Sequence, residues 1–389
     1  MLAAAAVVAA AGALGCGDWS APTVATQRSL AITVSGVVPQ GSLSAAGDVD
    51  GDGRPDVTIE DVGRRRVWLL VSRGGARLVA LEHFRAGGTV NSSTGVTPLG
   101  DLDGDGRAEL ALHTRRGSMT VLYGRTRWPS RVDLHAAPGA DAATVVGTAA
   151  TGQPSLVART GRALTIGVSC VARDCSPNVI YRVTAPAPGQ VARLAGAERL
   201  PAPVPAAGDG RLELGASDVW ANGTPPVLSW TVDLPGDEGA SAPLLQAGPR
   251  TWRLGESELL VGATPGAALV ATSSDAPPGE ANLWALVLRR LDDDGGTKRR
   301  ELVKENETFA GGALTTAGRC LLVSGWTATP PMVWAIDARS LDTVKHWAYP
   351  GAAMVVAQAA AGGRTVDSVV VRGSGTLART TTPLPDDCA

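Results

Sequence analysis

The side chains best placed for chemistry are the carboxylates of two short segments, GDVDGDGRPDVTIED from Gly47 and GDLDGDGRAELALHT from Gly100. Counted from its first Asp, each segment has acidic residues at positions 1, 3, 5 and 9. These are Asp48, Asp50, Asp52 and Asp56 in the first segment, and Asp101, Asp103, Asp105 and Glu109 in the second. Because four carboxylates within nine residues repel one another, the pattern predicts a cation among them.

Calcium is the cation that suits this donor set, since it takes about 6–8 oxygen ligands in flexible geometry. Alternate residues of a tight loop can point inward, and Gly53 and Gly106 permit the sharp turn. The seventh position can add a backbone carbonyl, from Arg54 and Arg107, whose side chains we expect to point outward. Two solvated Asp-Gly turns are the alternative, but two near-identical copies favour two calcium sites.

An EF-hand is excluded because it needs a Glu at position 12 and flanking helices. That position is Ile59 in the first segment and Leu112 in the second. Both are followed by short apolar runs typical of strands, such as VWLL from Val67.

A motif of the form DxDxDGxx[DE], preceded by glycine and followed by a short apolar strand, resembles the FG-GAP/VCBS repeat. That repeat builds the blades of integrin-alpha-like β-propellers. The resemblance implies that the loop binds Ca²⁺ between two strands of a blade, where the ion mainly holds the loop rigid.

Five weaker copies of the same layout follow the two acidic ones: a loop, an apolar strand, a polar turn and a second apolar strand. Their starts fall near residues 147, 217, 262, 312 and 357. They lack the carboxylate set, so we expect no calcium there. Seven units over residues 30–389 average roughly 51 residues each, which suits a propeller blade. The prediction is an all-β protein, a seven-bladed β-propeller of four-stranded antiparallel blades.

The first residues look like a targeting signal. Residues 2–14 are apolar and uncharged, and are shorter than the ~20 residues of a membrane span. They end in the sequence ALGC, which resembles a lipobox and implies that Cys16 is lipidated. We therefore predict a lipoprotein-type signal peptide over residues 1–15, a short linker over 16–29 and the propeller over 30–389. An ordinary signal with a chance cysteine is the alternative.

The remaining cysteines are even in number, as expected for an exported protein. They are Cys170, Cys175, Cys320 and Cys388. Three pairings are possible; in one, Cys170 and Cys175 clasp a tight loop while Cys320 and Cys388 tie the chain end to the body. Free buried thiols are the alternative.

No catalytic residues are predicted. The four His show no metal-ligand spacing, and nucleophile-elbow, phosphate-loop and dinucleotide motifs are absent from the sequence. The net charge of -2 argues against binding of nucleic acid.

We predict a monomeric, calcium-binding lipoprotein of the bacterial cell surface that recognises a protein or glycan without catalysis. The alternatives are a secreted carbohydrate-active hydrolase or lyase on the same scaffold, and a purely structural envelope protein.

Overall fold

The structure is a computed structural model, and it describes part of the 389-residue chain. The described residues are 23–24, 32–33, 43–61, 66–73, 76–82, 96–114, 118–134, 141–147, 153–169, 179–200, 212–220, 227–233, 241–247, 250–255, 258–264, 266–273, 284–291, 297–306, 312–325, 330–360, 362–372 and 376–388. The predicted signal peptide, Cys16, Cys170 and Cys175 lie outside these residues.

The described residues form seven sheets, named here sheets 1 to 7. Sheet 1 contains β3 (Leu43–Gly47), β4 (Asp56–Asp61), β5 (Arg66–Val71), β6 (Arg77–Glu82) and β10 (Arg131–Asp133). Sheet 2 contains β7 (Val96–Gly100), β8 (Glu109–Thr114), β9 (Ser118–Leu122), β11 (Ala142–Val146) and β15 (Val191–Arg193). Sheet 3 contains β12 (Gln153–Thr160), β13 (Ala163–Ser169), β14 (Val179–Thr184) and β16 (Glu198–Leu200).

The other four sheets continue the same order along the chain. Sheet 4 contains β17 (Leu212–Trp220), β18 (Val227–Asp233), β19 (Ser241–Ala247) and β20 (Arg250–Arg253). Sheet 5 contains β21 (Glu258–Thr264), β22 (Ala267–Ser273), β23 (Trp284–Leu291) and β24 (Thr297–Asn306). Sheet 6 contains β25 (Gly312–Ala317), β26 (Cys320–Gly325), β27 (Met332–Asp337), β28 (Thr343–Ala348) and β1 (Thr23–Val24). Sheet 7 contains β29 (Ala352–Ala359), β30 (Thr365–Arg372), β31 (Thr376–Pro383) and β2 (Ile32–Thr33).

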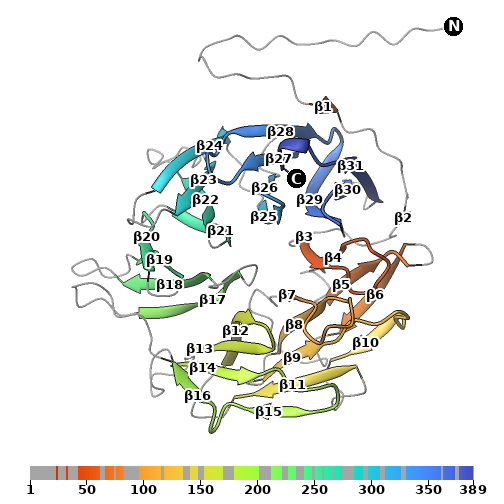
Figure 1. The fold of residues 1–389 in the computed structure, drawn as a ribbon, viewed down its shortest axis with the longest axis vertical. Coiled ribbons are helices and arrows are strands. Elements are labelled where there is room, and N and C mark those ends of the chain that lie inside the picture. The colour runs from red at the N-terminus through yellow and green to blue at the C-terminus, as the bar shows by residue number, and fades with distance from the viewer. Residues whose placement is uncertain are drawn as a thin grey trace, which may run out of the picture.

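The all-β prediction is confirmed, since the helix assigned in the described residues is a single 3-10 turn, η1 (Asp386–Cys388). The sheets are arranged around a common centre (Figure 1). Neighbouring sheets contact one another in series, and the series returns from β29 of sheet 7 to β3 of sheet 1. No helix within the described ranges has the length and apolar character needed to cross a bilayer.

Three sheets have five strands rather than the predicted four, and the fifth pairs in parallel. The connection between β9 and β11 supplies β10 to sheet 1, and the connection between β14 and β16 supplies β15 to sheet 2. In the same way β1, from the predicted linker, pairs with β28, and β2 pairs with β31. Strands of two or three residues carry no sequence period, so these edge-covering pairings were not predictable.

The hydrophobic core lies between adjacent sheets. Val67 and Leu69 of β5 pack in one cluster with Leu110 and Leu112 of β8, and all four are almost fully buried. Short apolar strands with both faces covered need no strict alternation of apolar and polar residues, which explains runs such as that of β26.

Contacts between sheets 7 and 1 join the two ends of the chain. The buried side chain of Gln358 donates from Nε2 to the carbonyl of Asp56 at 2.8 Å, and its Oε1 accepts the N–H of Gly47 at 3.3 Å. The guanidinium of Arg379 donates to the carbonyl of Pro55. Sheet 7 therefore holds both ends of the first acidic segment.

The third repeat lies one strand away from its predicted place. The sequence places a loop at residue 147, with the strand up to Thr160 as the one that follows it. In the structure that strand is β12, the first strand of sheet 3, and the turn at Gly161 separates it from β13. The loops expected for repeats four to seven do follow the first strands of their sheets.

The structure pairs Cys320 with Cys388, with a Cα–Cα distance of 5.1 Å. The N–H of Arg319 also donates to the carbonyl of Cys388 at 2.9 Å. The disulfide and this bond tie η1 to the start of β26.

Candidate metal centres

Two acidic loops with the same backbone conformation connect the first two strands of sheets 1 and 2. Loop 1 is defined as residues 48–56, between β3 and β4, and loop 2 as residues 101–109, between β7 and β8. The φ angles of Gly53 and Gly106 are 85° and 83°, a left-handed conformation that favours glycine. The sequence repeat therefore reproduces one loop shape twice.

The first Asp of each loop folds the loop around its own carboxylate. Asp48 accepts the N–H groups of Gly51 at 2.8 Å, Asp52 at 3.1 Å and Gly53 at 2.8 Å. Asp101 accepts the three equivalent N–H groups of loop 2 at 2.7, 3.1 and 3.0 Å. A carboxylate that accepts several local N–H groups stabilises a tight turn on its own.

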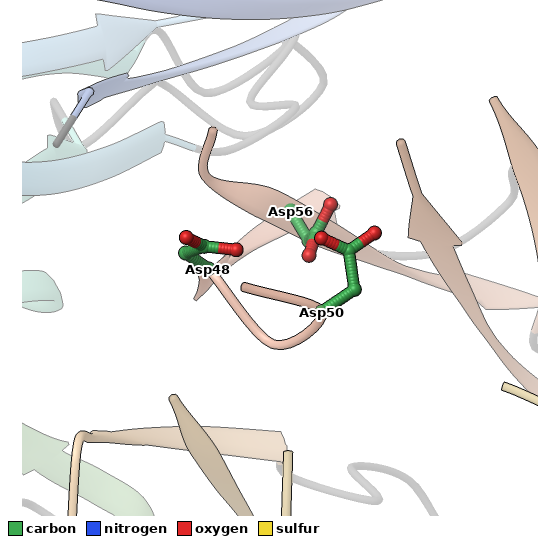
Figure 2. A group of neighbouring side chains, drawn as sticks. All are labelled: Asp48, Asp50 and Asp56. Carbon is green, nitrogen blue, oxygen red and sulfur yellow. The ribbon is translucent and has the colours of Figure 1, made fainter. Parts of the chain in front are cut away.

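Three of the four predicted carboxylates converge in each loop. In loop 1, oxygen atoms of Asp48, Asp50 and Asp56 lie within 4.8 Å of one another. Figure 2 shows these three side chains. Asp101, Asp103 and Glu109 form the equivalent set in loop 2. Each set brings together side chains from the start of the loop and from the first residue of the following strand.

Burial makes the charges of loop 1 costly without a cation. Asp50 and Asp56 are 1% and 0% exposed. Burial, followed by the negative charge of Asp50, raises the pKa of Asp56 to about 8, although Arg379 opposes the shift. Burial also raises the pKa of Asp50, while the N–H of Arg73 lowers it.

Glu109 occupies the place of Asp56 in loop 2, and it is also fully buried. Burial raises its pKa to about 7, against the lowering effect of hydrogen bonds from the N–H groups of Leu102 and Gly124. In loop 1, Asp56 accepts the N–H of Val49 at 3.0 Å. Both ninth-position carboxylates therefore stabilise their loop by accepting hydrogen bonds from its backbone N–H groups.

The fifth-position carboxylates lie outside the two converging sets. Asp52 accepts the N–H of Arg54 at 2.9 Å and the hydroxyl of Ser72 at 2.8 Å. Asp105 accepts the N–H of Arg107 at 2.9 Å and also pairs with the Arg107 guanidinium. The Arg107 side chain bonds to groups outside the converging set, since its Nε also donates to the carbonyl of Gly124 at 3.2 Å.

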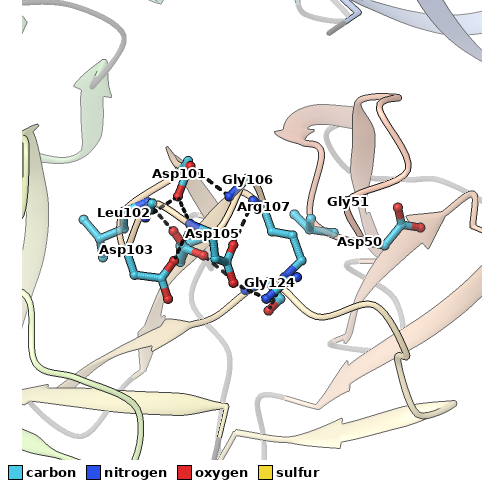
Figure 3. A network of polar contacts seen from close by, with 12 residues as sticks. Asp50, Gly51, Asp101, Leu102, Asp103, Asp105, Gly106, Arg107 and Gly124 are labelled. Carbon is cyan, nitrogen blue, oxygen red and sulfur yellow. Dashed lines mark hydrogen bonds and ion pairs between the residues drawn. The ribbon is translucent and has the colours of Figure 1, made fainter.

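The two loops are packed directly against one another. The N–H of Ala108 donates to the carbonyl of Asp48 at 2.7 Å, and the N–H of Arg125 donates to the carbonyl of Val49 at 3.0 Å. Figure 3 shows Arg107 extending from loop 2 towards Gly51 of loop 1. A Cβ added at Gly51 would lie 3.0 Å from Cγ of Arg107, and Gly51 has a φ of 73°, so glycine suits this close approach.

Sheet 3 holds the other side of loop 2. The guanidinium of Arg159 donates to the carbonyls of Leu99 and Asp101, and its Nε donates to the carbonyl of Gly161 at 2.8 Å. Loop 2 is thus held between loop 1 and the hairpin turn of the next sheet.

The donor chemistry of both loops fits calcium. Each converging set supplies carboxylate oxygens alone, the hard ligands that calcium prefers, and each includes a fully buried carboxylate. A divalent ion would offset the burial and the weaker repulsion that raise the pKa of Asp56 and Glu109. In such a site Asp48, Asp50 and Asp56, or Asp101, Asp103 and Glu109, would hold the ion.

Sequence reasoning missed the residues that support the loops from other strands. Asp50 accepts the N–H groups of Ser72 at 3.1 Å and Arg73 at 2.7 Å, both just after β5. Gly124, just after β9, is the equivalent of Ser72 in sheet 2. The available signal was that Ser72 and Gly124 occupy the same position, after the second strand of each repeat. Because serine and glycine are unlike, this one pair does not reveal the equivalence.

Comparison with known proteins supports the FG-GAP resemblance. Residues 48–112 match the family model described as FG-GAP-like repeat. No curated protein sequence matches the chain significantly. Among solved structures, the BBS1N chain of a complex with ARL6DN has a TM-score of 0.46 at 12% identity, covering 94% of this chain and 99% of that one.

Two further structures show similarities of the same kind. A prolyl endopeptidase has a TM-score of 0.43 at 11% identity, covering 90% of this chain and 51% of its own. Sqt1 of Saccharomyces cerevisiae has a TM-score of 0.36 at 11% identity, covering 93% of this chain and 99% of its own. These scores are too low to transfer a function. The segment that holds both acidic loops is thus similar to an FG-GAP-like repeat.

Proposed function

We propose that this chain is a seven-bladed β-propeller that binds two calcium ions and serves, as a lipoprotein of the bacterial cell surface, as a non-enzymatic binding module. One observation carries the proposal: two loops share one backbone conformation, and each gathers three carboxylates, of which two are buried in loop 1 and one in loop 2. Seven sheets that contact one another in series support the propeller.

Calcium has a structural role in this proposal. Loop 1 contacts the turn after β5 through Asp50, and it contacts sheet 7 through Gln358. An ion held by Asp50 and Asp56 would fix these contacts and stiffen the face on which both loops lie. Extracellular calcium modules bind their ions with dissociation constants of about 10⁻⁴–10⁻³ M, and a similar value is expected here.

The bonding of the buried carboxylates supports the proposed non-enzymatic role. Glu258 pairs with Arg289, and Asp367 accepts the hydroxyl of Thr381. The carboxylates of the loops accept backbone N–H groups. Each of these carboxylates therefore has a bonding partner within the protein.

Isothermal titration calorimetry of the full chain with calcium tests the metal sites. We expect about two sites, one of which Asp50→Ala should remove and the other Asp103→Ala, because each substitution deletes one oxygen donor. Asp386→Ala is the matched control, since Asp386 is exposed on η1. An absence of binding heat, or heat unchanged in both loop variants, contradicts the proposal.

The lipid anchor is supported by the sequence before Cys16. Metabolic labelling with palmitate in a bacterial host should label the unaltered protein, which should be found in the membrane fraction. The Cys16→Ser variant lacks the acceptor thiol, so it should be unlabelled and released from that fraction. Labelling that persists in the Cys16→Ser variant would show that the acyl chain is attached elsewhere.

A further inference from the structure

We propose that a basic cleft between sheets 1 and 2 binds the sulfate or carboxylate groups of an acidic saccharide. The inference rests on the proposed binding function and names the ligand class for it. Arg73, Arg77, Thr126 and Arg127 line the cleft, which has a volume of about 480 Å³. Small-molecule sites commonly measure about 300–1,000 Å³, so the cleft has room for one or two sugar rings.

The cleft joins two sheets next to loop 1. Arg73 and Arg77 come from the turn after β5 and the start of β6, whereas Thr126 and Arg127 follow β9. The same segment after β9 is bonded to loop 1, because Arg125 donates its N–H to Val49. Both walls are therefore positioned by the packing of the acidic loops.

The positive charge of the cleft is available to a ligand. Arg77 and Arg127 are exposed, and in the part of the chain that the structure describes neither has an ion pair or a side-chain hydrogen bond. The whole chain carries a net charge of -2, so three arginines in one cleft are a local concentration. Guanidinium groups bind carboxylate and sulfate oxygens through paired N–H donors.

Arg73 links the cleft to the candidate calcium site. Its Nη1 donates to the carbonyl of Asp50 at 2.8 Å, and its backbone N–H donates to the Asp50 carboxylate at 2.7 Å. These bonds hold the stem of Arg73 in place and leave other guanidinium donors for a ligand. An ion that orders Asp50 would also order this wall of the cleft.

The chemistry of the lining favours a saccharide over a macromolecule. Protein-binding sites depend on buried apolar or aromatic anchors, yet these lining residues are all polar. Across the described residues, the exposed large hydrophobic side chain is Val191, which lies on β15 of sheet 2. Nucleic acid requires a wider basic surface than three arginines.

Calorimetry of the full chain in calcium tests the cleft with three probes: a sulfated oligosaccharide, a uronic acid oligosaccharide and inorganic sulfate. One of the two saccharides should bind, and the Arg77→Gln/Arg127→Gln variant should lose about 10-fold or more in affinity. The variant should still bind calcium with unchanged stoichiometry, which separates failure of the cleft from failure of the metal sites. Inorganic sulfate should bind more weakly than the saccharide.

Arg253→Gln/Arg364→Gln is the matched control, because both arginines are exposed away from the cleft, on β20 and just before β30, and the change in charge is the same. This control should bind the saccharide like the unaltered protein. An equal loss in both double variants, or no binding by either saccharide, overturns the proposal. So does tighter binding of a polyglutamate peptide or of inorganic sulfate. Unchanged saccharide affinity in EDTA would overturn the link to loop 1.

Discussion

In EDTA, the free energy of unfolding should fall as the pH rises from near 4 to about 8, and calcium should abolish this fall. Burial raises the pKa of Asp56 from 3.8 to about 8 and that of Glu109 from 4.5 to about 7. A carboxyl with a raised pKa in the folded state favours folding when protonated, so its contribution is complete below the unfolded pKa. That contribution is lost as the pH rises through the folded pKa.

Urea unfolding at several pH values, with EDTA and with calcium, measures this effect. Saturating calcium at about 100 times its dissociation constant should add ~2.7 kcal/mol per site above the pH at which the carboxyls ionise. Below that pH, protons compete with the ion and the gain should shrink.

Asp56→Asn is the informative control for this pH dependence. The amide group of Asn cannot ionise, but its oxygen can still accept the N–H of Val49. In EDTA, the variant should therefore lose less stability than the unaltered protein as the pH rises, and it should respond less to calcium. A fall of equal size in both proteins would show that Asp56 is not the group responsible.

Removal of the Cys320–Cys388 disulfide should lower the free energy of unfolding by about 4 kcal/mol, the value expected from the entropy of closing a loop of this length. The two cysteines are 68 residues apart in sequence, so the bond restricts a long segment of the unfolded chain. The measurement is urea unfolding of the Cys320→Ala/Cys388→Ala variant. Alanine is chosen because both positions are almost fully buried and would not tolerate a hydroxyl without a partner.

Reduced unaltered protein is the control for the cysteine variant. Dithiothreitol should shift the unfolding of the unaltered protein towards that of the variant, and by more than it shifts the variant itself, which keeps Cys170 and Cys175. If the oxidised protein and the variant unfold at the same urea concentration, the pairing of Cys320 with Cys388 makes no contribution and the assignment fails.

Hydrogen bonds of the two acidic loops connect four neighbouring sheets, sheets 7, 1, 2 and 3. Loop 1 receives bonds from Gln358 of sheet 7 and from Ala108 of sheet 2, and Arg159 of sheet 3 binds loop 2. A change in how rigidly a loop is held therefore affects the neighbouring sheets through direct hydrogen bonds. This arrangement explains why an ion at a loop would stiffen the surface around the cleft.

The sequence alone determined the local chemistry of this protein. The spacing of Asp48, Asp50 and Asp56 places three carboxylates on one turn, because a tight loop with glycines at set places has few allowed conformations. Alternating turn residues and short apolar runs likewise determined an all-β chain. These features depend on neighbours within about ten residues, and such contacts can be deduced from spacing.

Only the tertiary structure decided which strand stands where and what supports each loop. A buried apolar strand looks the same in any position of a sheet, so β12 was taken for the second strand of its repeat rather than the first. The bonds of Gln358 to loop 1 and the meeting of Arg77 with Arg127 join residues that are distant in sequence. Their partners follow from the packing of whole sheets, which no local spacing encodes.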